Sequence, residues 1–201
     1  MNKHYPKVII QVIDIFKSLP GVGARSAERM VLSMINWDDA KINALSELFK
    51  IFPESIGKCE KCGNLSEKNS LCYICKSPIR NEEIICIVED FTQINNMEKS
   101  SYKGLYHVLG GKLSPLSGKN PEDLNINSLI DRIKSNEVKE VVLALSSDIE
   151  GQATAVYLSN LLNDYDIVVS QLAHGIPIGA DISYADSATL QKAISARIKL
   201  N

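Results

Sequence analysis

The stretch Cys59-Glu60-Lys61-Cys62, followed after nine intervening residues by Cys72-Tyr73-Ile74-Cys75, decides how this chain is organised. Each C-x-x-C pair can direct two sulfurs at one point, so the four thiolates form a tetrahedral shell for Zn²⁺. Because four protein ligands leave no open coordination position, we expect a structural ion. The candidate zinc ligands are Cys59, Cys62, Cys72 and Cys75.

Two disulfides or four unliganded thiols are the alternatives for these cysteines. The sequence shows no apolar signal segment near its N-terminus, so we expect a reducing compartment, the cytoplasm, which favours zinc. The residues between the pairs are mainly polar. We therefore expect the metal to supply most of the local folding free energy, roughly 10–16 kcal/mol in small zinc peptides. The fifth cysteine, Cys86, lies in an apolar run and is expected to be a buried core thiol.

Upstream of the cysteines, the spacing of apolar residues predicts helices over residues 6–18 and 24–35. They are joined by Pro20-Gly21-Val22-Gly23, which is the helix-hairpin-helix pattern. We expect Gly21 and Gly23 to adopt φ > 0 in a tight turn. Their missing side chains would let amides at the start of the second helix approach a phosphate.

Two arginines follow the turn. Arg25 and Arg29 are four residues apart and therefore share one helix face, where they can add charge-assisted contacts to a DNA backbone. This predicts DNA binding without sequence preference. The alternative is a plain helical hairpin whose arginines are only solvated.

A third helix is predicted over residues 38–52, with Pro53 ending it. Its expected apolar stripe is Ile42, Leu45, Leu48, Phe49 and Phe52.

From residue 84 onward, apolar runs alternate with helical patterns. The predicted strands are 84–88, 105–109, 138–145 and 167–172, and the predicted helices are 92–99, 127–135 and 152–163. Apolar strands that alternate with helices predict a parallel sheet covered on both faces. The expected fold class is thus a multi-module α/β chain: a helix-hairpin-helix, a four-cysteine zinc finger, a parallel α/β domain and a short C-terminal tail.

Acidic residues follow two of these strands. Glu89 and Asp90 come after the first, and Asp148 and Glu150 after the third. Carboxylates that meet at neighbouring strand ends can form an oxygen site for Mg²⁺. The alternative is that these acidic loops only cap the following helices through the helix dipole.

This part of the chain resembles the Toprim fold of topoisomerases and primases. That family has a glutamate after its first strand, which Glu89 matches, and an Asp-x-Asp motif later, which Asp148-x-Glu150 matches with a glutamate in the last position. The longer glutamate alters the reach of the second carboxylate.

Over essentially the whole chain, the order of modules resembles the RecR family of bacterial recombination mediators. The run from Gly104 to Leu116 is the most specific part, since no general fold demands it. The matching stretches are Leu19–Gly23, Cys59–Cys75, Ile87–Asp90, Tyr106–Leu116, Glu150–Thr154, Gly175–Gly179 and Tyr184–Asp186. Two positions depart from the family: Gln152 stands where an acidic residue is usual, and His174 where an arginine is usual.

The resemblance implies a DNA-repair adaptor rather than an enzyme. Members assemble as ring-like tetramers around a hole wide enough for duplex DNA. They act with RecO, and with RecF where present, to load RecA onto single-stranded DNA. Their Toprim module is a partner-docking and metal-site platform, so that Glu89, Asp90, Asp148 and Glu150 would dock partners and hold Mg²⁺. Basic hairpin residues bind DNA, here Arg25 and Arg29, and the segment from Val168 to Asp181 contributes to subunit contacts.

On this basis we expect modules over residues 1–53 (DNA binding), 54–78 (zinc), 79–178 (Toprim) and 179–201 (tail and helix). The formal charge of -2 gives no global sign of nucleic-acid binding, but a ring would focus several copies of one basic patch on a central hole. No apolar run approaches the ~20 residues of a membrane span, so we expect a cytoplasmic, nucleoid-associated protein. Two alternatives remain open: a Mg²⁺-dependent Toprim nuclease or topoisomerase-like enzyme, and a zinc-ribbon docking protein without DNA affinity.

Overall fold

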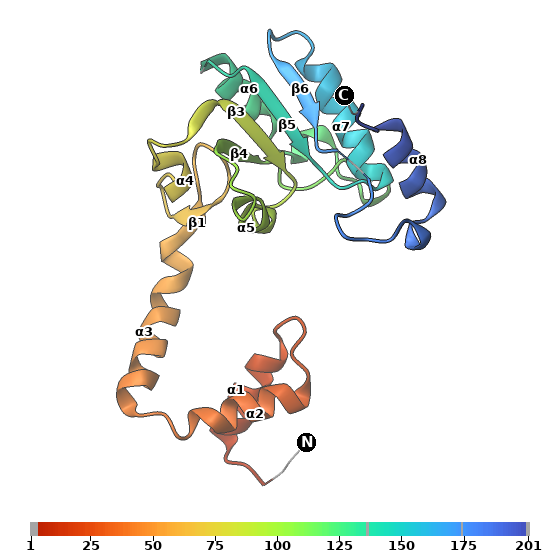
Figure 1. Cartoon of the computed structure of the whole chain (residues 1–201). Coiled ribbons are helices and arrows are strands. Elements are labelled where there is room, and N and C mark those ends of the chain that lie inside the picture. Colours follow the sequence, from red (N-terminus) through yellow and green to blue (C-terminus); the bar gives the residue numbers. More distant parts are fainter. Residues whose placement is uncertain (1–3, 136, 174, 200–201) are drawn as a thin grey trace. The chain divides into compact units, whose positions relative to one another are not determined.

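The computed structural model describes residues 4–135, 137–173 and 175–199. The chain divides into two compact units, one ending at Ser55 and the other beginning at Ile56. Figure 1 shows the helices of the first unit in red to orange and the sheet of the second in yellow to blue. His174, one of the two departures from the family pattern, lies outside the described residues.

From residue 4 onward, the first unit contains three helices: α1 (Lys7–Lys17), α2 (Ala24–Met34) and α3 (Asp39–Ser55). All three lie where the apolar spacing predicts them. α3 begins after Asp38, whose carboxylate accepts a hydrogen bond from the Lys41 amide (2.8 Å) and so caps the helix. The prediction that Pro53 ends the helix is wrong, because α3 continues to Ser55 with Pro53 inside its last turn. The missing N–H of this proline removes one backbone hydrogen bond, and the helix nevertheless continues for two residues beyond it.

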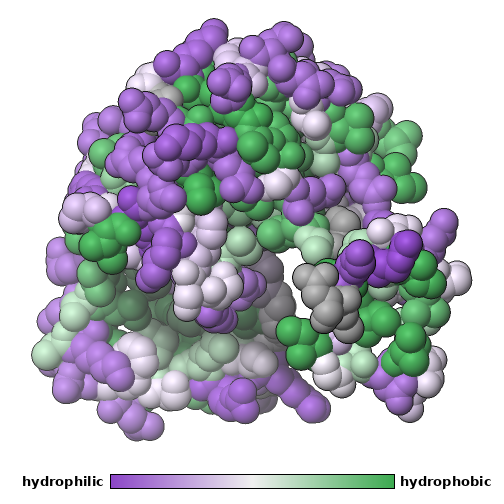
Figure 2. All heavy atoms as spheres, turned by 45° about the horizontal axis from the view of Figure 1, so that its top comes forward, coloured by the Kyte–Doolittle hydropathy of each residue, from purple (hydrophilic) through white to green (hydrophobic). Residues whose placement is uncertain are grey.

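The helices of this unit bury little of their apolar surface. Within α1–α3, Ala27 and Val31 are the residues classed as buried, and both lie on α2. The predicted apolar stripe of α3 is present but largely uncovered, with Leu48 and Phe52 each 61% exposed. Apolar side chains reach the surface elsewhere too, as the green spheres on the face drawn in Figure 2 show. An uncovered stripe of this kind needs another surface to pack against.

The second unit opens with the cysteine module. It consists of the antiparallel pair β1 (Ile56–Lys58) and β2 (Leu65–Glu67), followed by the short helix α4 (Tyr73–Lys76).

A four-stranded parallel sheet follows, with strand order β4-β3-β5-β6. Its strands are β3 (Asn81–Val88), β4 (Gly104–Val108), β5 (Glu140–Ala144) and β6 (Val168–Gln171). The connecting and C-terminal helices are α5 (Thr92–Glu98), α6 (Ile126–Ser135), α7 (Ile149–Leu162) and α8 (Ser187–Ser195). Short 3-10 turns occupy Pro115–Ser117, Pro121–Asp123 and Ile182–Tyr184. The predicted parallel α/β domain is therefore confirmed.

Alternate residues of the central strands face two separate cores. Ile87 of β3 and Leu143 of β5 belong to one core together with residues of α6 and α7. Cys86 and Val88 of β3 belong to the other, together with α5 and three of the four motif cysteines. The period of two along β3 thus places α6 and α7 on one face of the sheet, and α5 with the cysteine module on the other. In the part of the chain that the structure describes, no helix is both long and apolar enough to cross a bilayer.

Candidate metal centre and nucleic-acid interface

The structure brings the four motif cysteines together. One sulfur from each of Cys59, Cys62, Cys72 and Cys75 lies within 4.8 Å of all the others, and the sulfurs of Cys62 and Cys72 are 3.6 Å apart. Four sulfurs bound about 2.3 Å from a tetrahedral zinc ion lie about 3.8 Å from one another. All four cysteines are free thiols. The donor set therefore fits a closed tetrahedral zinc site, which would be structural.

Local backbone geometry forms the first cysteine knuckle. The Gly63 amide donates to the Cys59 carbonyl (2.9 Å), and the Cys59 amide donates to the Asn64 carbonyl (2.6 Å). Gly63 has φ +76°, and a Cβ there would come 3.3 Å from Val108. Only glycine meets both demands without strain. The knuckle thus lies directly against β4.

The second knuckle is the start of a helix. Cys72 is the N-cap of α4, and Cys75 lies within that helix. Hydrogen bonds from the Cys62 and Cys75 thiols lower the pKa of Cys72, and the bond to Cys72 raises the pKa of Cys62. Because a metal-bound sulfur must be deprotonated, zinc binding would displace the protons of these thiols. Cys86 is fully buried, as predicted, and burial raises its pKa to about 12, so it stays a thiol.

The hairpin turn presents the start of α2 without a side-chain cap. Gly21 has φ +78°, as predicted for a tight turn. The same prediction is wrong for Gly23, which has φ −78° and is the N-cap of α2 in an extended conformation. Because Gly23 has no side chain to accept from the first helical amides, these N–H groups remain open to an anion.

Arg25 and Arg29 lie on α2 just beyond this turn, and both are exposed. No ion pair found among the described residues involves either guanidinium. The turn amides are thus adjacent, on one helix, to two positive charges that have no ion-pair partner among the described residues.

The acidic residues at the strand ends are each held by protein donors. Glu89, directly after β3, accepts from the amide of Ser146 (2.5 Å) and from its hydroxyl. Glu150, in the first turn of α7, accepts from the hydroxyl of Ser114. Asp90 is exposed and accepts from the Thr92 amide (2.9 Å).

Asp148 is the N-cap of α7 and accepts from the Gly151 amide (2.7 Å). The capping role weighed as an alternative for the acidic loops is therefore present at Asp148. Among the described residues, the cysteine cluster is the one set of three or more potential metal ligands that meet within 4.8 Å. The carboxylates at the strand ends do not form such a set.

A lysine contributes the positive charge at this acidic edge. The Lys112 ammonium pairs with Asp148 and also donates to the Ser146 hydroxyl (3.3 Å). The bond to Asp148 raises the pKa of Lys112, and the charges of Glu89 and Glu150 add to that effect. Lys112 in turn lowers the pKa of Asp148. The site therefore contains its own cation.

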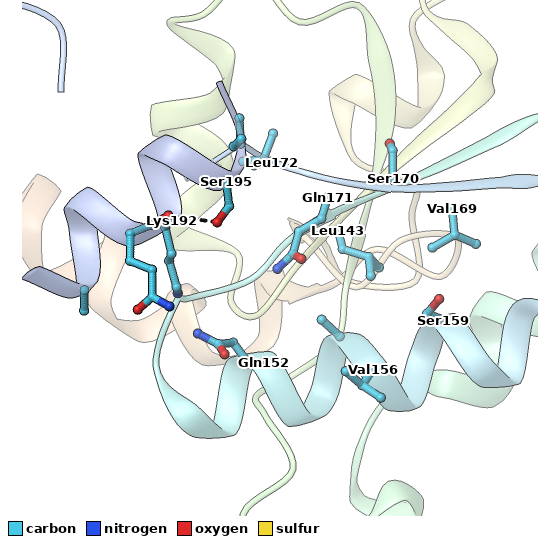
Figure 3. A pocket seen from close by; sticks show the side chains of 15 residues that line it. Leu143, Gln152, Val156, Ser159, Val169, Ser170, Gln171, Leu172, Lys192 and Ser195 are labelled. Atoms are coloured by element: carbon cyan, nitrogen blue, oxygen red, sulfur yellow. Dashed lines mark hydrogen bonds between the residues drawn. The ribbon is translucent and has the colours of Figure 1, made fainter. Parts of the chain in front are cut away.

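Sequence reasoning missed Lys112 and the two serines that hold Glu89 and Glu150. A signal was available, since Lys112 and Ser114 lie in the stretch singled out as the most specific of the chain. Of the two departures from the family pattern, Gln152 lies within the described residues, and its side chain donates to the Ser147 carbonyl (2.6 Å). Figure 3 shows it on α7, where it lines a pocket of about 810 Å³ to which residues of β6 and α8 also contribute. This pocket is lined by other residues than the four acidic ones.

Comparison with known proteins assigns each module. Family models match residues 9–50 as the RecR helix-hairpin-helix, 56–77 as the RecR zinc finger domain of the four-cysteine type, 83–173 as a Toprim domain and 175–198 as the RecR C-terminal region. Proteins named "Recombination protein RecR" from Staphylococcus saprophyticus, Staphylococcus haemolyticus and Staphylococcus aureus are each 41% identical over 198 residues. The match covers 98% of this chain and 100% of each relative.

Proposed function

The chain belongs to the RecR family of recombination proteins, and from that membership we propose that it is a DNA-repair recombination mediator and not an enzyme. In this role it binds single- and double-stranded DNA as a ring-like oligomer, a tetramer. It acts with RecO-type and RecF-type proteins to load RecA onto single-stranded DNA. The relatives' printed name supports the recombination role.

The observation that carries the proposal is the start of α2. Its amides are uncapped at Gly23, and the exposed Arg25 and Arg29 follow on the same helix. A helix N-terminus favours phosphate through its dipole and its free N–H groups. Such contacts address the DNA backbone alone, which suits a protein that must act on any damaged sequence.

The exposed apolar surface of α1–α3 supports self-association. Leu48, Phe49 and Phe52 of α3 are each more than half exposed, which is unfavourable in a monomer. A second copy of the chain is the natural partner in a ring.

We predict that the double variant Leu48→Glu with Phe52→Glu loses the tetramer. These side chains lie one turn apart on one face of α3, and two charges there prevent that face from packing against another copy. Sedimentation velocity is the measurement, with the subunit mass as the expected result. Lys50→Glu is the matched control, because it also changes the charge by two negative units but on an exposed residue paired with Glu47. Equal masses for the double variant and the wild type would exclude α3 from the interface.

We assign the acidic edge of the sheet to partner docking. The Lys112 ammonium lies among Asp148, Glu89 and Glu150. It supplies positive charge at the place where a hydrolytic enzyme would use a divalent metal ion. This arrangement supports a binding surface over a hydrolytic centre. A Mg²⁺-dependent nuclease that uses Glu89, Asp148 and Glu150 is the alternative.

One experiment separates the two functions. The protein is incubated with single-stranded DNA coated by single-strand-binding protein, a RecO-type partner and RecA, with Mg²⁺ or Mn²⁺ present. We expect faster RecA loading and intact DNA. DNA cleavage that disappears in Glu89→Gln would establish the nuclease instead, and unchanged loading with intact DNA would refute the mediator role.

A further inference from the structure

Arg132 is a buried cation with two donors that lack a partner. It lies on α6 and is 5% exposed, next to the apolar Ile133. Its Nη1 donates to the Tyr106 carbonyl (2.5 Å). Within the described residues, its Nε and Nη2 have no hydrogen-bond partner. Burying a charge costs several kcal/mol unless an anion and hydrogen bonds compensate, so such an anion should lie nearby.

The neighbour of Arg132 along the edge of β4 is the first cysteine knuckle. Residues two apart in a strand direct their backbone groups to the same side. The Tyr106 carbonyl accepts a hydrogen bond from the Arg132 guanidinium, and the Val108 amide donates to the Cys62 carbonyl (2.8 Å). The guanidinium and the Cys62 knuckle therefore occupy adjacent positions on one strand edge.

Once they are deprotonated, the thiols of the cysteine cluster are the ionisable groups with the largest effect on Arg132. Burial lowers the pKa of Arg132, and charges on Cys75, Cys62 and Cys59, followed by Glu82, act in the opposite direction. Glu82 already pairs with Lys61 (3.3 Å). His107, which is buried on β4 itself, is neutral because burial lowers its pKa to about 4.

A zinc ion with four thiolates has a net charge of two negative units, since four sulfur charges exceed the two of the metal. We propose that Arg132 is the counter-charge of this zinc centre, with its unpartnered Nε–H and Nη2–H donors directed at the thiolate sulfurs. It is a positioning residue of the metal site and not a ligand. The zinc centre and α6 are thereby linked by charge as well as by packing.

Zinc affinity of the intact protein tests the proposal. Arg132→Gln removes the charge but keeps a side-chain amide donor, and Arg132→Met removes both the charge and the donor. Each should bind zinc about 10–100-fold more weakly in competition with a chromophoric chelator, the usual cost of losing a group that supports metal ligands. After Co²⁺ substitution, the thiolate-to-cobalt charge-transfer band should move to lower energy. Arg132→Lys, which keeps the charge, should bind zinc within about threefold of wild type, a small part of that cost.

Arg80→Met is the matched control. Arg80 also donates to backbone carbonyls near β4, those of Tyr102 and Gly104, but it is paired with Glu98. We expect a less stable protein with wild-type zinc affinity and an unshifted band. Wild-type affinity and band position in folded Arg132→Gln would overturn the proposal and assign the two donors to a buried water. An equal loss in Arg80→Met would overturn it as well.

Discussion

Replacing Cys62 with serine should abolish stoichiometric zinc binding and unfold the cysteine module together with the neighbouring edge of β4. The serine hydroxyl is a poor zinc ligand, and three thiolates cannot close the shell. In small zinc peptides the metal supplies roughly 10–16 kcal/mol, so no other interaction in this polar module can replace it. Cys62 also accepts the Val108 amide through its carbonyl, which carries the damage into the sheet.

The measurements are metal analysis of the purified protein and hydrogen exchange of its backbone amides. Wild type should contain one zinc per chain, and Cys62→Ser none, with faster exchange at Val108. Cys86→Ala is the control, because Cys86 is a buried thiol outside the cluster and its loss leaves four ligands. A wild-type protein that is folded, metal-free and has four reactive motif thiols would contradict the zinc assignment.

The double variant Arg25→Ala with Arg29→Ala should lose at least about tenfold in DNA affinity and flatten its salt dependence. Each phosphate neutralised on duplex DNA contributes a slope of about −0.9 in log affinity against log salt. Two arginines therefore account for up to about 1.8 of the slope in every subunit that touches DNA. In an oligomer, the substitution recurs in each copy, so the loss exceeds that of a single contact.

The experiment is a titration of duplex and single-stranded DNA at several salt concentrations. Lys17→Ala with Lys50→Ala is a control of equal charge, since both lysines lie in the same unit and pair with acidic residues on their own helices. This control should shift the affinity far less. If the arginine variant keeps its affinity and slope while its oligomer stays intact, the DNA site lies on another surface.

Local features of the chain can be predicted from the sequence because they depend on nearby residues. The C-x-x-C pairs each form their own knuckle, and the apolar spacing of α1 and α2 decides their helices. The errors are also local. The sequence predicts that Pro53 ends α3, but this proline removes only its own backbone hydrogen bond and the helix continues to Ser55. It also predicts a positive φ for Gly23, which instead caps α2 with a negative φ.

Long-range contacts could not be predicted. Lys112 reaches Asp148 thirty-six positions later, and Arg132 reaches back twenty-six positions to Tyr106. Nothing in the spacing of the sequence pairs these residues, since the parallel sheet and its crossover helices bring them together. The sequence could place Glu89 and Asp148 at strand ends, but the lysine between them depends on the folded loop after β4.

The first cysteine knuckle also protects the edge of the sheet. All five residues of β4 are buried, and β3 pairs with one side only. On the other side, the Val108 amide donates to the Cys62 carbonyl, and Arg132 donates to the Tyr106 carbonyl. An uncovered apolar edge strand pairs readily with other chains and so starts aggregation. Oxidation of the thiols or removal of the metal would release the knuckle and uncover this edge. Protein that loses its zinc should therefore leave solution as an aggregate, which makes the metal a safeguard of solubility.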